Sequence, residues 1–254
     1  MRLKLLYNPR LLIERLAIES ERYRRLGKLK GTVASNLKLG HIDSLELLEI
    51  ARDYFKDLKF IYDIGANVGT WSLLAKAIFP NAVIHAFEPL SMHLDGFNKN
   101  TSHIADIMLH QLALGSQENS LVMQVASFSD ASSLLEIAPA TYDAFGITKE
   151  REEIVKVVVL DDFVTQNNIP FPDLIKLDIQ GYELEALKGA LKCLNSAKCL
   201  IIEVSFIEFY HGQPLFHEVV EFLYQHNFYL CAFGANTPLA KEISQCDALF
   251  IRKY

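Results

Sequence analysis

From about residue 58 onward, short apolar runs alternate with amphipathic helical stretches. This alternation is typical of βαβ units, in which the strands are almost continuously apolar because helices cover both faces of the sheet. The sequence therefore predicts an α/β fold with a mostly parallel, Rossmann-like sheet. The predicted strands are 60–64, 82–87, 106–113, 154–160, 174–178, 199–204, 228–233 and 248–252, and a hairpin strand is expected at 121–126.

The first part of the chain has a different pattern. Between residues 9 and 56, strong helix formers carry apolar residues three and four positions apart, with breaks at Gly27, Gly31 and Gly40. We therefore expect two or three helices. The chain divides into a helical N-terminal extension at 1–57 and one α/β domain at 58–254, and 254 residues with 50% hydrophobic content suffice for one substantial core.

Charge is distributed unevenly along the chain. Residues 1–30 hold nine Lys or Arg against three Glu, a net charge of +6, whereas the whole chain carries −6, so the remaining residues carry −12. An acidic protein lacks the basic surface that nucleic-acid binding needs, which excludes nucleic acid as the expected partner. The basic segment suits peripheral contact with an anionic membrane or an acidic partner. A solvated helix paired to the acidic body is the commoner arrangement.

Cysteine usage and hydropathy indicate the compartment. The four cysteines form no C-x-x-C pair and have no histidine at zinc-finger spacing, so neither a disulfide framework nor a structural zinc is expected. No signal peptide and no transmembrane run of about 18 apolar residues is recognisable. We expect a cytoplasmic protein, and the sequence leaves open whether it forms a homo-oligomer.

The stretch 61–72, IYDIGANVGTWS, follows the first predicted strand. Asp63 lies near the strand end, Gly65 lets a ligand approach the turn, and Gly69 opens a helix whose free N–H groups can receive an anion. A dinucleotide fingerprint needs a glycine where Asn67 stands, so no pyrophosphate cradle is predicted. An acid for an ammonium group and a helix start for a carboxylate indicate an amino-acid moiety.

Glu88, in FEP at the end of the second strand, adds a nucleoside to this ligand. A carboxylate there can accept hydrogen bonds from both hydroxyls of a ribose. An amino acid joined to a nucleoside is S-adenosylmethionine, whose adenine would lie beside Leu112 and Ala113 after the third strand. The predicted cofactor-binding residues are Asp63, Gly65, Ala66, Asn67, Gly69, Ser72, Glu88, Pro89, Leu112 and Ala113.

Two later strands also end in carboxylates. Asp178 should face the crevice where open α/β sheets bind ligands, and Glu203 is costly to bury unless it is bonded or used. With Glu183, these acids could instead form an oxygen-rich Mg²⁺ site, but the spacing alone does not establish one, and we predict no metal. The predicted catalytic residues are Asp178, Glu203 and His211.

These blocks resemble the FkbM family of S-adenosylmethionine-dependent methyltransferases. The resemblance rests on DIGANVG at 63–69, FEP at 87–89, ALG at 113–115, LDDF at 160–163 and IKLDIQGYE at 175–183. It implies a class I methyltransferase sheet with an antiparallel last strand, and O-methylation of a hydroxyl on a sugar, glycan or secondary metabolite. Gln180 departs from the family, which commonly has Glu there.

Other functions remain open at this stage. The acceptor could be a peptide carboxylate or an amine, because the cofactor half of the site is indifferent to that choice. An NAD-dependent oxidoreductase is favoured by the acid after strand two but opposed by the missing glycine, and a non-catalytic binding module is opposed by the intact cofactor turn. The loop 129–133 is expected to be a solvated turn, and Trp71, the only tryptophan, is expected to pack in the core.

Overall fold

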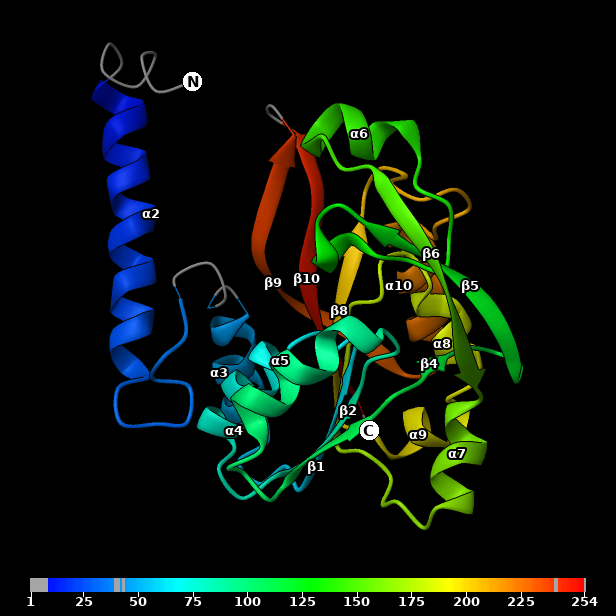
Figure 1. The fold of residues 1–254 in the computed structure, drawn as a ribbon. Coiled ribbons are helices and arrows are strands. Elements are labelled where there is room, and N and C mark those ends of the chain that lie inside the picture. The colour runs from blue at the N-terminus through cyan, green and yellow to red at the C-terminus, as the bar shows by residue number, and fades with distance from the viewer. Residues whose placement is uncertain (1–8, 39–41, 43, 240–241, 254) are drawn as a thin grey trace.

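The computed structural model describes residues 9–38, 42, 44–239 and 242–253. The described residues form a seven-stranded sheet, in which every strand but one runs in the same direction (Figure 1). Across the sheet lie β3 (Ile107–His110), β2 (Val83–Phe87), β1 (Phe60–Ile64), β7 (Leu174–Leu177), β8 (Cys199–Ser205), β10 (Glu242–Arg252) and β9 (Phe228–Leu239). The α/β fold is confirmed, and β10 is the predicted antiparallel strand.

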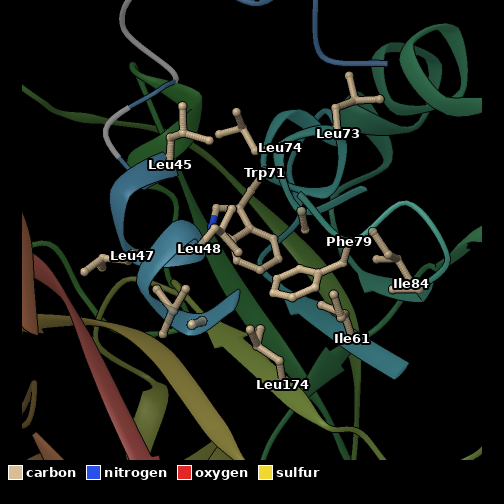
Figure 2. Packing of buried hydrophobic residues seen from close by; sticks show 14 of the residues in the cluster. Leu45, Leu47, Leu48, Ile61, Trp71, Leu73, Leu74, Phe79, Ile84 and Leu174 are labelled. Atoms are coloured by element: carbon tan, nitrogen blue, oxygen red, sulfur yellow. The ribbon is translucent and has the colours of Figure 1, made fainter. Parts of the chain in front are cut away.

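Helices cover both faces of this sheet because neighbouring residues of each strand point to opposite sides. Ile61 packs with α3 (Leu45–Tyr54), α4 (Thr70–Ile78) and α5 (Ser91–Thr101), as Figure 2 shows in part. Tyr62 faces the second core cluster on the other side. The helices there are α7 (Leu160–Gln166), α8 (Glu183–Lys188), α9 (Leu191–Ser196) and α10 (Phe216–Gln225).

A second, three-stranded sheet corrects the prediction for 154–160. This segment belongs to β6 (Lys149–Val158), which pairs with β4 (Ala113–Leu114) and β5 (Asn119–Ala126) outside the main sheet. The burial of β6 alternates, with Val155 and Val157 buried and Ile154 and Lys156 exposed. That period of two is typical of a sheet with one wet face, so β6 does not lie between helices. The small helices η2 (Ser129–Ala131) and α6 (Pro139–Phe145) lie between β5 and β6.

Three predicted boundaries were wrong. The third strand ends at His110, because the chain leaves the main sheet before Ala113. The single helix expected over 182–191 is two helices, since Asp161 caps α9 by accepting bonds from the backbone N–H groups of Lys192 and Cys193 at 2.7 and 2.9 Å. Gly27 does not break a helix, as α2 (Pro9–Lys28) runs through it.

The basic N-terminal helix α2 is tied to α3 by charge. Arg25 forms an ion pair with Glu46, and the Nζ of Lys28 lies 2.7 Å from a carboxylate oxygen of Glu49. These contacts correspond to a basic helix paired to the acidic body. Contact with a membrane surface stays a prediction, as does the division at residue 57. Within the part of the chain that is described, no helix has the length and apolar character needed to cross a bilayer.

Two buried histidines meet between β2 and β3. The Nδ1 of His85 lies 3.0 Å from the Nε2 of His110, and the rings stack with their centroids 5.3 Å apart. Burial, and secondarily the charge of His110, lowers the pKa of His85 to about 4. The folded protein therefore favours the neutral imidazole.

This pair predicts a loss of stability in mild acid. Below pH 6.5 the unfolded chain takes up a proton that folded His85 refuses until about pH 4, so folding stability falls as the pH drops through this window. We expect the unfolding free energy, measured with urea at pH 7.5 and 4.5, to fall by about 2–3 kcal/mol more in the wild type than in His85→Leu. Equal losses in both proteins would contradict this role of the pair.

Candidate active site

A cavity of about 340 Å³ lies at the carboxyl ends of the central strands. Parallel strands bring their carboxyl ends to one edge of a sheet, so residues that are distant in sequence meet there. The predicted residues that line this cavity are Gly65, Ala66, Asn67, Glu88, Pro89, Leu112, Ala113, Asp178 and Glu203. These nine residues are therefore placed where a ligand could touch them, although their roles stay predictions.

Four predicted site residues do not line this cavity. Asp63 is 0% exposed, and one of its oxygens accepts a hydrogen bond from the Oγ of fully buried Ser72 at 2.7 Å. Gly69 faces Thr101 and Phe97 of α5 instead of a ligand, since a Cβ there would lie 2.9–3.1 Å from their side chains.

His211 is the fourth, and its predicted catalytic role is not supported by its position. Its side chain is exposed and lines neither this cavity nor a second one described below.

Lys176 stands between Asp63 and the cavity and was missed as a site residue. Its Nζ donates to the carbonyl of Gly65 at 2.9 Å and lies 3.4 Å from Asp63 Oδ1 and 3.6 Å from Asp178 Oδ2. Burial alone would lower the pKa of Lys176, but the carboxylates of Asp178, Asp63 and Asp247 raise it, so the ammonium stays charged. Asp63 therefore positions Lys176 and cannot reach a ligand directly. A buried Lys two residues before Asp178 was the available signal.

The glycine turn has the close backbone approach that the sequence predicts. Gly65 has φ +80°, and a Cβ on it would lie 1.9 Å from the carbonyl oxygen of Asp178. The N–H groups of Gly65 and Ala66 both donate to the carbonyl of Phe87 at 3.0 Å. The turn thus joins the ends of β1, β2 and β7 at a position that only glycine can occupy.

Glu88 is buried in the cavity wall and fixes the turn. Its two oxygens accept hydrogen bonds from the backbone N–H groups of Asn67 and Leu90, both at 2.9 Å. Each carboxylate oxygen can accept a further bond, so Glu88 keeps acceptor capacity for a ligand hydroxyl.

His93 of α5 lies beside Glu88 and was also missed. Its Nδ1 is 3.0 Å from Glu88 Oε1, but the groups are not aligned for a hydrogen bond. The side chain is buried in the cavity wall, and neither ring nitrogen has a hydrogen-bond partner among the described residues. Such groups are costly to bury without a partner, which indicates that a polar ligand completes them.

Asp178 and Glu203 are held together by an amide. The Nε2 of Gln180 donates to Asp178 Oδ1 and to Glu203 Oε2, both at 2.8 Å, and Gln245 donates to Glu203 Oε1 at 3.2 Å. Burial, followed by the carboxylates of Asp178 and Asp247, raises the pKa of Glu203 well above its usual range. Gln180 suits this place because an amide donates to two acids where an ionised Glu could only repel them.

Glu183 supports the turn instead of facing the cavity. Its Oε1 accepts the N–H groups of Ile179 and Gly181 at 3.0 and 3.1 Å, and burial raises its pKa to about 7. Glu183 is therefore occupied by backbone. The described residues contain no group of three His, Cys, Asp or Glu side chains arranged to hold a metal ion.

The loop 129–133 is not the solvated turn that was expected. Asp130 Oδ1 accepts a hydrogen bond from the side-chain amide of Asn67 at 2.9 Å, and Ser133 Oγ donates to the carbonyl of Gln180 at 2.6 Å. The loop thus crosses from the glycine turn to the acid cluster. A second cavity of about 470 Å³ lies beneath it.

The two cavities meet at a common wall. The residues that line both are Asp130, Asp178, Gln180, Glu203 and Gln245. A ligand in each cavity would therefore contact the same group of acids and amides.

The sequence matches the Methyltransferase FkbM domain over residues 63–230. The chain belongs to the FkbM methyltransferase family. The match begins at the aspartate before the glycine turn and includes β2, β7 and β8, so the family's shared segment is the one that builds the cavity. The cofactor of this FkbM domain is S-adenosylmethionine.

Two curated proteins are similar to part of this chain. Methyltransferase 1 from Beauveria bassiana is 28% identical over 148 residues, covering 53% of this chain and 59% of that protein. Hexuronic acid methyltransferase AglP from Haloferax volcanii is 26% identical over 147 residues, covering 57% and 55%. The chain thus matches little more than half the length of each.

Among solved structures, magnesium protoporphyrin IX methyltransferase from Synechocystis aligns with a TM-score of 0.49 at 13% identity, covering 92% of this chain and 91% of that one.

The cavity wall fits S-adenosylmethionine on its own evidence. The glycine turn admits a ligand where any Cβ would collide, Glu88 offers acceptors to a ribose, and His93 offers unpaired ring nitrogens. Leu112 and Ala113 form an apolar section of the same wall that suits adenine.

The contact at Gly65 predicts a position-specific loss of stability. Gly65→Ala adds left-handed strain of about 1–2 kcal/mol and a collision with Asp178, so we expect unfolding free energy to fall by roughly 2–5 kcal/mol. Gly31→Ala is the matched control, with φ +79° and open space, and should lose only the strain. Chemical unfolding measures both. Equal losses would mean that the close approach at Gly65 has no energetic consequence.

Proposed function

We propose that the chain is an S-adenosylmethionine-dependent O-methyltransferase that acts on a hydroxyl of a sugar, glycan or secondary metabolite. The observation that carries this proposal is the common wall of the two cavities, where Asp178 and Glu203 face both. The first cavity contains the cofactor turn. The second is then the place for the acceptor, with its hydroxyl at Asp178.

The second cavity combines aromatic and polar surfaces. Phe128 and Phe145 are partly exposed at its edge, and Phe209 and Tyr210 lie deeper. The Tyr210 hydroxyl lies 2.9 Å from Gln180 Oε1, which connects this surface to the acid cluster. Apolar rings beside hydrogen-bonding groups suit a hydroxylated acceptor with an apolar face, such as a sugar ring.

The chemistry depends chiefly on positioning. The cofactor supplies an activated methyl group, and the protein has to hold an acceptor oxygen in line with it. Such orientation contributes about 7–11 kcal/mol to barrier lowering, whereas a general base adds roughly 10²–10⁴-fold. The rigid turn at Gly65 and the loop over the second cavity are the elements that provide this positioning.

Asp178 is the better of the two candidate bases. Glu203 is buried, and its raised pKa favours the protonated form near neutral pH. The side chain of Asp178 is 35% exposed and is accompanied by the Lys176 ammonium at 3.6 Å. We therefore assign proton removal from the acceptor hydroxyl to Asp178, and to Glu203 the part of a neutral neighbour that helps position Gln180.

One relative supports a carbohydrate acceptor. AglP of Haloferax volcanii is named as a hexuronic acid methyltransferase, so a sugar acceptor occurs among proteins similar to this domain. A carboxylate acceptor is the main alternative. Transfer of labelled methyl from S-adenosylmethionine to an extract of the producing cells separates the two, because a methyl ether survives mild base and a methyl ester is hydrolysed. Base-labile product alone would contradict the hydroxyl acceptor.

Two functions of other classes predict different binding. Calorimetry should detect S-adenosylmethionine and no NADH. Binding of NADH alone would favour an oxidoreductase, and binding of neither would favour a non-catalytic module.

Glu88 should determine cofactor affinity. Glu88→Gln retains the shape of the side chain but loses its charge, so the bonds to ribose hydroxyls weaken and the Kd for S-adenosylmethionine should rise about tenfold or more. Glu153→Gln is the matched control, since Glu153 also accepts bonds from the start of α5, at Ser91, but does not line the cavity. A Kd that changes equally in both variants would remove Glu88 from the ribose site.

Asp178 should determine turnover more than affinity. Asp178→Asn retains the size of the side chain and removes the base, so methyl transfer should fall by about 10²–10⁴-fold while the Kd for S-adenosylmethionine changes by less than about threefold. Asp162→Asn, on the exposed side of α7, is the control and should be fully active. A fully active Asp178→Asn enzyme would exclude Asp178 as the base.

A further inference from the structure

The first cavity extends past the glycine turn to the start of α3. Its lining there consists of Ser44, Trp71, Leu74 and Asp247. Trp71 lies in the first turn of α4, and Figure 2 shows its indole ring among the side chains that join α3 to α4 and the sheet. Most of this ring is therefore packed as expected, but one part of it lines the cavity.

The polar atom of this ring lacks a partner. Trp71 is 8% exposed, and its Nε1–H has no acceptor among the described residues. An indole N–H is a donor only, and burying a donor unpaired costs free energy that a bound acceptor would recover. The simplest acceptor is a ligand oxygen in the cavity that Trp71 lines.

A carboxylate of the protein lies across this end of the cavity. Asp247 of β10 pairs in register with Glu203 and accepts a hydrogen bond from Ser44 Oγ at 2.6 Å. A donor and a carboxylate on the same wall match the two charges of an α-amino acid, whose carboxylate accepts and whose ammonium donates. Asp63, predicted from the sequence to hold the ammonium, is sealed behind Lys176.

We propose that Trp71 binds the methionyl carboxylate of S-adenosylmethionine through its Nε1–H, and that Asp247 lies beside the methionyl ammonium. This inference rests on the proposed function. It assigns a binding role to the start of α3, because Ser44 orients Asp247 and the leucines of α3 hold the indole ring. The amino-acid end of the cofactor would then lie under α3, opposite the adenine wall at Leu112.

The single tryptophan makes the proposal testable in the unmodified protein. In a ¹⁵N-labelled sample the chain gives one indole N–H resonance. S-adenosylhomocysteine should move its proton downfield and slow its exchange with solvent, because a carboxylate accepts the hydrogen. 5′-Methylthioadenosine, which lacks the amino acid, should do neither at saturation. Equal shifts with both compounds, or no shift with S-adenosylhomocysteine bound, would overturn the proposal.

A variant separates hydrogen bonding from packing. Trp71→Phe removes the N–H, so the Kd for S-adenosylmethionine should rise about tenfold or more. Decarboxylated S-adenosylmethionine lacks only the carboxylate, and its Kd should change by less than about twofold. Equal weakening of both ligands would show a packing role and overturn the proposal, and so would two unchanged affinities.

These outcomes are distinct from failure of the proposed function. If calorimetry finds no binding of S-adenosylmethionine or S-adenosylhomocysteine to the wild type, the proposed function and this inference fall together. If both bind and the indole resonance stays in place, only the inference falls.

Discussion

The contact between Gly65 and the end of β7 is the constraint on which the site depends. The missing Cβ lets the turn after β1 lie against the carbonyl of Asp178, and the Lys176 ammonium fastens the same turn by bonding the Gly65 carbonyl. Cofactor turn and candidate base are therefore one rigid unit. Displacing the turn would also displace Asp178, so the arrangement couples the position of the methyl donor to that of the group that deprotonates the acceptor.

The concentration of acids around this contact needs compensation, because like charges at close range raise one another's pKa. Three devices provide it. Lys176 supplies a buried positive charge between Asp63 and Asp178, the amide of Gln180 bridges Asp178 and Glu203, and the raised pKa of Glu203 removes a negative charge. The residue that departs from the family pattern, Gln180, is thus the donor that lets the two acids lie side by side.

Local pattern was enough to predict the sheet and the glycine turn, because strand hydrophobicity and the spacing of Gly65 from Glu88 are encoded in short segments. It failed where tertiary contact decides. Asp63 and His211 have suitable chemistry, but Lys176 covers the first and the second is exposed beside a loop. The second sheet could have been recognised from the alternating burial expected for 149–158. The unpaired nitrogens of His93 and Trp71 could not, since a missing partner is a property of the folded structure.

The central claim is that one crevice at the carboxyl edge of the sheet holds the nucleoside and the methionyl group together, with the transferable methyl directed at the second cavity. A crystal structure with S-adenosylhomocysteine tests it most directly. The account predicts ribose at Glu88, the sulfur facing Asp178, and the amino acid beneath α3. Well-defined ligand elsewhere on the protein, with the glycine turn empty, would contradict it.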